Sequence, residues 1–155
     1  MVKVGDAIPD VELFEDSPGN KVNLSKELAS GKGLIIGVPA AFSPGCSDSH
    51  IPGYLADKRT KEAGKAFVIS VNDAFVMKAW GKQMDSDKTS GLRFLGDAAG
   101  ELTRAWDVEF DARPLMGNMR SKRYAVMTEN GKVTKVAIEP DNIGISESAA
   151  DKFFS

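Results

Sequence analysis

The chain has 155 residues, of which 42% are hydrophobic and 27% charged, and its formal net charge is -2 at pH 7. This length and composition predict one globular domain spanning residues 1–155. The small net charge gives no electrostatic basis for binding nucleic acid or an anionic membrane, and the apolar runs are too short to span a bilayer. The N-terminus shows no secretory leader and the C-terminus is not Ser-Lys-Leu, so we expect a cytoplasmic location.

The first half of the chain predicts strands followed by one long helix. Residues 11–14 and 21–24 are typical of a β-hairpin around the turn residues 17–20. The apolar run 34–38 predicts a buried strand. A helix is expected from Cys46 to about Glu62, with a kink at Pro52, because proline removes one backbone donor.

The second half continues the alternation of strands and helices. Residues 66–71 predict a buried strand, and Asn72 or Asp73 can cap a helix that buries Val76, Ala79 and Trp80 on one face. A short strand at 93–95 precedes a helix over 98–106, which Asp97 can cap.

The C-terminal part predicts a hairpin and a last helix. Residues 124–128 and 133–138 are strand-like and flank Asn130-Gly131, the dipeptide that most favours a two-residue hairpin turn. Ser146 can cap a short helix ending near Phe154. Helices alternating with strands, followed by a hairpin, predict a three-layer α/β fold around a central mixed sheet.

Cys46 is the only cysteine, and it falls where the strand over 34–38 gives way to a helix. A helix N-terminus carries unpaired N–H groups and partial positive charge, and both stabilise a thiolate, the nucleophilic form of cysteine. Ser43 supplies a hydroxyl one turn earlier. One cysteine cannot form an intramolecular disulfide, and one cysteine with one histidine cannot complete a metal site.

The run from Pro39 to Cys46, Pro-Ala-Ala-Phe-Ser-Pro-Gly-Cys, resembles the peroxidatic loop of peroxiredoxins, Pro-x-x-x-(Thr/Ser)-x-x-Cys. Pro39, Ser43 and Cys46 fill its fixed positions. Further segments resemble the peroxiredoxin-5 (type II, atypical) subfamily: residues 4–9, 19–24, 70–76 and 79–81. The resemblance covers nearly the whole chain and implies a thioredoxin-like fold with an N-terminal β-hairpin.

The resemblance also implies a peroxidase that reduces hydrogen peroxide and alkyl hydroperoxides through Cys46, without a metal or organic cofactor. The chain has six arginines, and the family position of the essential one, after a lysine and before an aromatic residue, is occupied by Arg123. Pro39 is expected to shield the thiolate. Ser43 replaces the more usual threonine and keeps its hydroxyl. We expect substrate contacts at Ser43, Gly45 and Cys46.

The chain departs from many subfamily members because Glu147 stands where they carry a second, resolving cysteine. The sulfenic acid of Cys46 would then be reduced by an external thiol of the glutathione, glutaredoxin or thioredoxin type. A non-covalent homodimer is expected from the family. The alternative is a non-enzymatic redox sensor or chaperone-like protein that uses Cys46 oxidation as a switch. We expect His50 to be a packed or capping residue, since Cys46 and His50 lack a third orienting group.

Overall fold

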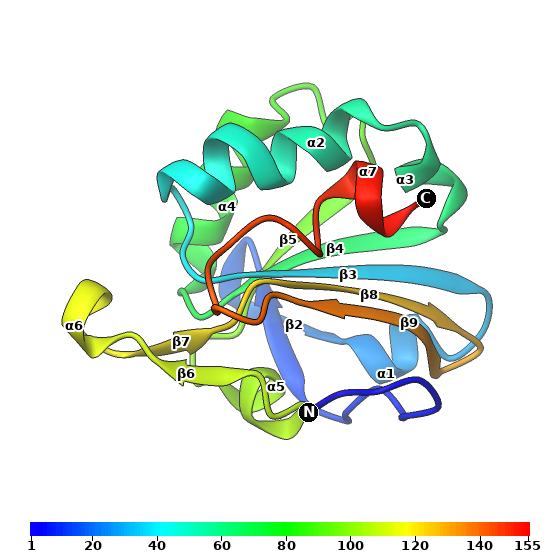
Figure 1. Cartoon of the computed structure of the whole chain (residues 1–155), viewed down its shortest axis with the longest axis horizontal. Coiled ribbons are helices and arrows are strands. Elements are labelled where there is room, and N and C mark those ends of the chain that lie inside the picture. The colour runs from blue at the N-terminus through cyan, green and yellow to red at the C-terminus, as the bar shows by residue number, and fades with distance from the viewer.

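The computed structural model describes residues 1–155 and is built around a seven-stranded mixed sheet with the order β2-β1-β5-β4-β3-β8-β9 (Figure 1). The central strands β3, β4 and β5 are parallel, and the outer pairs are antiparallel. The strands of this sheet are β1 (Glu12–Glu15), β2 (Ser17–Asn23), β3 (Lys32–Val38), β4 (Lys65–Ser70), β5 (Leu92–Gly96), β8 (Tyr124–Glu129) and β9 (Lys132–Ile138).

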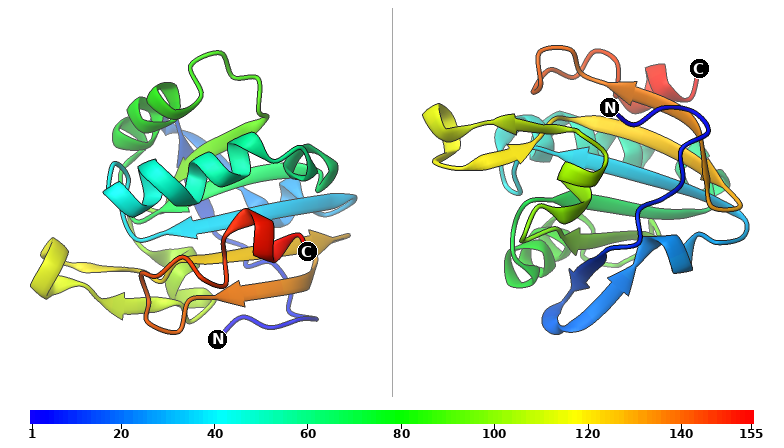
Figure 2. Two further views of the ribbon diagram at one scale, coloured as in Figure 1. Left: turned by 45° about the horizontal axis from the view of Figure 1, so that its top comes forward. Right: turned by 90° about the horizontal axis from the view of Figure 1, so that it is seen from below.

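Helices cover both faces of the sheet, as Figures 1 and 2 show. The helices α2, α3, α4 and α7 lie on one face, and α1 and α5 lie on the other. Their bounds are α1 (Leu24–Glu27), α2 (Ile51–Ala56), α3 (Arg59–Glu62), α4 (Ala74–Met84), α5 (Glu101–Ala105) and α7 (Ala150–Phe153). This arrangement confirms the predicted three-layer α/β fold with a mixed sheet.

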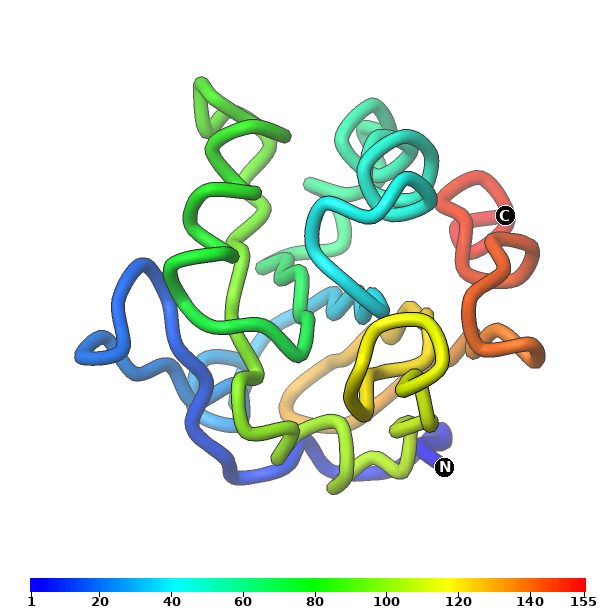
Figure 3. The backbone as a smooth tube through the Cα atoms, turned by 90° about the vertical axis from the view of Figure 1, so that its left-hand side faces the viewer, coloured from blue at the N-terminus to red at the C-terminus, as the bar shows by residue number.

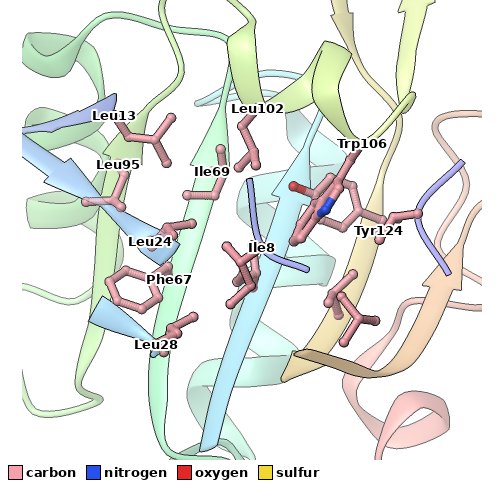
Figure 4. Packing of buried hydrophobic residues seen from close by; sticks show 14 of the residues in the cluster. Ile8, Leu13, Leu24, Leu28, Phe67, Ile69, Leu95, Leu102, Trp106 and Tyr124 are labelled. Atoms are coloured by element: carbon pink, nitrogen blue, oxygen red, sulfur yellow. The ribbon is translucent and has the colours of Figure 1, made fainter. Parts of the chain in front are cut away.

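The two faces of the sheet bury separate hydrophobic clusters of 16 residues each. One cluster packs α1 and α5 against the sheet and includes Leu24, Leu102 and Trp106 (Figure 4). The other lies under α2 and α4 and contains Cys46 and Trp80. Because β3 and β4 are covered on both faces, nearly all of their residues are buried. No helix combines the length and the apolar character needed to cross a membrane.

The predicted N-terminal hairpin forms, but its turn lies earlier than expected. β1 and β2 pair antiparallel, with Glu15 opposite Ser17, and the chain reverses at Asp16, whose φ is +67°. Residues 17–20, predicted as the turn, belong to β2. Asp16 tolerates the left-handed conformation that this tight reversal needs, because a short polar side chain accommodates it better than most.

The segment after Cys46 is not the single kinked helix that was predicted. Helical structure begins at Pro44 and continues as one π-helical turn, η1 (Cys46–His50), closed by the N–H of Ile51 donating to the carbonyl of Cys46. α2 follows without a break, and Pro52, its second residue, has no N–H to donate back into η1. α2 stops at Ala56, and α3 is a separate short helix.

Helix α4 matches the prediction in position and only partly in its buried face. Asp73 caps it by accepting a hydrogen bond from the N–H of Val76 at 2.9 Å. Trp80 is fully buried as predicted, whereas Ala79 is exposed and Met77 takes its place in the core. The buried residues of α4 are therefore Ala74, Met77 and Trp80, while Val76 is only half-buried.

Of two further capping predictions, one is confirmed for the capping residue but not for the start of the helix, and the other is wrong. Asp97 does cap the following helix, accepting from the N–H of Thr103 at 2.9 Å, but α5 starts only at Glu101, after a left-handed Gly100. Ser146 was predicted to cap the last helix, and this is wrong. Its hydroxyl donates to the carboxylate of Glu139, and α7 begins at 150 without a side-chain cap.

The hairpin of β8 and β9 confirms the prediction made from Asn130-Gly131, since both residues have positive φ, +49° and +81°. An additional two-stranded arm was not predicted. It consists of β6 (Glu109–Asp111), α6 (Arg113–Met116) and β7 (Met119–Ser121). The arm extends beyond the sheet (Figure 1), and in the end-on view of Figure 3 it lies in yellow near the cyan segment through which the chain enters η1.

Candidate functional site

The thiol of Cys46 lies at the carboxyl end of β3, in the first helical turn after the loop 39–43. The N–H of Ser47 donates to the carbonyl of Ser43 at 2.8 Å, which closes that first turn. The thiol is therefore where the early N–H groups of a helix and their partial positive charge are found, as predicted. Cys46 is completely buried, with 0% of its surface exposed.

Arg123 is the arginine that the fold brings to the thiol. It lies just before β8, and its Nη1 donates to the Sγ of Cys46 at 3.2 Å, although the two residues are 77 positions apart. Its Nε donates to the carbonyl of Ile143 at 3.1 Å. Only 3% of Arg123 is exposed, so its charge acts on the sulfur with little screening by water. The placement agrees with the residue chosen by family position.

His50 is packed against this pair, which makes it more than an isolated core histidine. Its Nδ1 lies 3.1 Å from Nη1 of Arg123, and its Nε2 lies 3.2 Å from the carbonyl of Ser148. Burial, reinforced by the charge of Arg123, lowers the pKa of His50 from 6.5 to about 3. A neutral ring that donates from Nε2 to Ser148 leaves Nδ1 as an acceptor for the guanidinium.

The remaining predicted site residues lie in the loop and turn that lead into Cys46. Pro39 is buried and Ser43 is half-buried, and no protein group accepts a hydrogen bond from the Ser43 hydroxyl. Gly45 permits the approach of the guanidinium, because a Cβ there would lie 3.0 Å from Nη2 of Arg123. Of these residues, Arg123 is the one that contacts the sulfur directly, and the roles of Pro39, Ser43, Gly45 and Arg123 stay predictions.

The loop before Cys46 is held by contacts that the sequence did not reveal. Oδ1 of Asn72 accepts from the N–H of Ala41 at 3.1 Å. Phe42 has a φ of +66°, which is rare for an aromatic residue, and its ring centroid lies 6.4 Å from that of Trp80. The Nε1 of Trp80 donates to Oγ of Ser47 at 2.9 Å. Trp80 therefore packs in the core and also supports the turn that carries the thiol.

No group of three or more histidine, cysteine, aspartate or glutamate side chains is arranged to hold a metal ion. What the site offers chemically is a buried sulfur nucleophile, a guanidinium within hydrogen-bond distance, and a free hydroxyl nearby. Such a set can hold a small polar substrate beside the sulfur and stabilise negative charge on a leaving oxygen.

Comparison with known proteins agrees with this chemistry. The chain matches the redoxin family over residues 3–153. It is 46% identical to peroxisomal membrane associated protein 20 of Schizosaccharomyces pombe, over 100% of this chain and 99% of that protein. It is 35% identical to peroxiredoxin-2D of Arabidopsis thaliana, over 97% and 95% of the two chains.

Solved structures show the same likeness. Peroxiredoxin 5 from Alvinella pompejana is 41% identical, with a TM-score of 0.81 over 94% of each chain. Reduced Prx3 from Vibrio vulnificus in complex with hydrogen peroxide is 31% identical, with a TM-score of 0.87 over 98% of this chain and 93% of that one. These matches establish a thiol-dependent peroxidase with a thioredoxin-like fold. The chain belongs to the redoxin family and, within it, to the peroxiredoxins of the peroxiredoxin-5 type.

The expected cytoplasmic location is corrected by one of these relatives. The protein from Schizosaccharomyces pombe, which matches along its whole length, is named for association with the peroxisomal membrane. The expectation rested on the lack of a leader and of a terminal Ser-Lys-Leu. Such short signals are read by receptors separately from the fold, so missing two of them is a poor basis for a location.

Proposed function

We propose that this protein reduces hydrogen peroxide and alkyl hydroperoxides by direct attack of the Cys46 thiolate on one peroxide oxygen. A sulfur–oxygen bond forms while the oxygen–oxygen bond breaks, and the second oxygen leaves as hydroxide or alkoxide and takes up a proton. Sulfur supplies the two electrons and becomes a sulfenic acid. The observation that carries the proposal is the 3.2 Å contact between Nη1 of Arg123 and Sγ of Cys46 in a buried site.

Each residue around the sulfur has a distinct role in this proposal. Arg123 favours the thiolate and stabilises the negative charge that develops on the leaving oxygen. The free hydroxyl of Ser43 and the backbone at Gly45 bind the peroxide beside Cys46. Pro39, buried at the start of the loop, keeps water from the sulfur.

The cycle is completed by an external thiol. Cys46 is the only cysteine, and the family's resolving position is occupied by Glu147, whose side chain pairs with Lys152 at 3.0 Å. A thiol of the glutathione, glutaredoxin or thioredoxin type therefore attacks the sulfenic sulfur and releases water, and a second thiol cleaves the mixed disulfide. Because the sulfur is fully buried, the residues that cover it must move aside before the peroxide or the reductant can reach it.

We also propose that residues 1–155 act as one domain and associate as a non-covalent homodimer. Exposed apolar side chains occur near the active-site loop: Phe42 is 44% exposed and Phe75 is 62% exposed. The arm adds the exposed Leu115, and Arg120 ties the arm to this region by donating to the carbonyl of Val71 at 2.9 Å. An apolar surface of this kind is typical of a protein interface.

By analogy with the relative from Schizosaccharomyces pombe, we place the protein at peroxisomes.

The second candidate function is a redox sensor in which Cys46 oxidation is a signal and turnover is incidental. Steady-state peroxide consumption with excess glutathione, or with a thioredoxin or glutaredoxin system, separates the two. Continuous consumption that disappears in Cys46→Ser supports the peroxidase. A single burst equal to the protein concentration, with no turnover under any of these reductants, would favour the sensor.

A further inference from the structure

Glu139 is a buried carboxylate outside the site described above. It directly follows β9 and has 0% of its surface exposed. Its two oxygens accept hydrogen bonds from the segment 146–148: from three backbone N–H groups, of Ser146, Glu147 and Ser148, and from both serine hydroxyls. The shortest are from Ser148, at 2.7 Å for its N–H and 2.6 Å for its hydroxyl.

These hydrogen bonds keep the carboxylate ionised inside the protein. Burial raises the pKa of Glu139, but the bonds from Ser148 and Ser146 outweigh it and leave the pKa below the ordinary value. A buried anion held by donors from one segment fixes that segment in place, since leaving any of the donors unpaired costs free energy.

The fixed segment contacts the active site through the carbonyl of Ser148. This carbonyl accepts from Nε2 of His50 at 3.2 Å and from the hydroxyl of Tyr54 at 2.5 Å. The other nitrogen of His50 then accepts from Nη1 of Arg123 at 3.1 Å, and the same Nη1 donates to the sulfur of Cys46. A continuous series of hydrogen bonds therefore joins Glu139 to the thiol.

The loop that begins at Glu139 also contacts Arg123 directly. The N–H of Glu139 donates to the carbonyl of Arg123 at 3.0 Å, and the N–H of Arg123 donates to the carbonyl of Asn142 at 2.8 Å. The Nε of Arg123 also donates to the carbonyl of Ile143 at 3.1 Å. The loop 139–148 thus holds Arg123 in two ways: it contacts the backbone and Nε of Arg123 directly, and it contacts Nη1 through His50.

We propose that Glu139 is a positioning residue for peroxide reduction, which holds the guanidinium of Arg123 against Cys46 through Ser148 and His50. This inference rests on the proposed role of Arg123. Without the carboxylate, the Ser148 carbonyl loses its fixed place, the His50 ring can turn, and Nη1 of Arg123 loses the acceptor that aims it at the sulfur.

Glu139 can affect the thiolate of Cys46 through its own negative charge or through the placement of Arg123. These two effects change thiol ionisation in opposite directions, so an experiment can separate them. A nearby negative charge disfavours a second anion, so removing the charge alone would favour the thiolate. Loss of positioning withdraws the donor from the sulfur and disfavours the thiolate. The sign of the change in thiol ionisation therefore tells which effect operates.

The test is Glu139→Gln, which keeps the shape but turns an NH2 group toward N–H donors. We expect the pH midpoint for alkylation of Cys46 to rise, because the sulfur loses the donor that favours its ionised form. The single-turnover rate with hydrogen peroxide should fall about 10- to 100-fold, as expected for a misplacement of roughly 1 Å. In a His50→Gln background the same substitution should have little further effect, because the connection is already broken.

Asp97→Asn is the matched control. Asp97 is also a buried carboxylate that accepts from backbone N–H groups and a hydroxyl, but it holds α5 on the opposite face of the sheet. This variant should lose comparable stability in urea while the alkylation midpoint and the peroxide rate stay within twofold of the parent values. If Glu139→Gln does not fold, Ser148→Ala, which removes one donor to the carboxylate, should shift the midpoint in the same direction by less.

An unchanged or lowered midpoint in Glu139→Gln, with a peroxide rate within twofold of the parent, would overturn the inference. Equal effects of Asp97→Asn on both readouts would also overturn it. Failure of the proposed function looks different, since the parent protein would then show no peroxide turnover. The alkylation profile would still report whether Glu139 positions Arg123.

Discussion

Arg123→Lys isolates the contribution of the guanidinium fork from that of its positive charge. In the structure Arg123 serves three acceptors: Sγ of Cys46 at 3.2 Å, Nδ1 of His50 at 3.1 Å and the carbonyl of Ile143 at 3.1 Å. Lysine keeps a charge but has a single nitrogen at the end of a flexible stem, so it cannot reproduce this set of directions.

The expected loss follows from what the fork does in the transition state. Removing one preorganised donor from an oxyanion site lowers the rate about 100- to 1000-fold. Since lysine retains some of the electrostatic stabilisation, we expect the second-order rate with hydrogen peroxide to fall about 10- to 1000-fold, or about 1.4–4 kcal/mol in activation free energy. Stopped-flow tryptophan fluorescence suits the measurement, because Trp80 donates to the hydroxyl of Ser47, next to Cys46.

Arg120→Lys is the control for this experiment. In the parent protein, Nη1 of Arg120 donates to the carbonyl of Val71 at 2.9 Å and its Nε donates to Oδ1 of Asn118 at 2.8 Å. This side chain therefore makes no hydrogen bond to the sulfur of Cys46. The peroxide rate of Arg120→Lys should stay within about twofold of the parent rate, because neither hydrogen bond of this side chain involves the sulfur. A parent-like rate in Arg123→Lys, or an equal loss in Arg120→Lys, would refute the reasoning.

Three further outcomes are expected. Because burial lowers the pKa of His50 to about 3, the unfolded chain binds a proton between pH 6.5 and 3 that the folded chain does not, so stability falls as pH decreases through this window. Glutamine cannot take up this proton, so the urea midpoints of His50→Gln at pH 7 and pH 4 should differ by less than those of the parent protein. An equal difference in the two proteins would contradict this. Peroxide without reductant should add one and then two oxygens to Cys46 by intact mass, and a dominant covalent dimer on a non-reducing gel would show that two Cys46 residues resolve each other. Gly37→Ala should destabilise the fold by about 1–3 kcal/mol in urea, since its Cβ would lie 1.9 Å from the ring of Tyr124, and parent-like stability would show that this ring can move aside.

Much of the fold could be predicted because local chemistry determines it. The apolar runs in β3 and β4 match strands covered on both faces, and Asn130-Gly131 supplies the positive φ values of the last hairpin. Predictions failed where distant contacts decide the outcome. Ser146 resembles a helix cap in sequence, but a buried carboxylate seven residues earlier, Glu139, takes its hydroxyl and its N–H.

The sequence by itself determined the reactive atom and the limits of its chemistry. A lone Cys46 after a Pro-x-x-x-Ser-x-x motif specifies the nucleophile and excludes an intramolecular disulfide, since no second thiol exists. The arginine could be chosen among six only by resemblance, whereas the tertiary structure places it 3.2 Å from a sulfur 77 residues away. The tertiary structure alone decided that the sulfur is buried, that His50 is held neutral beside Arg123, and that Glu139 is joined to both. Burial and hydrogen-bond direction depend on what the folded chain brings together, and no local pattern of residues records either.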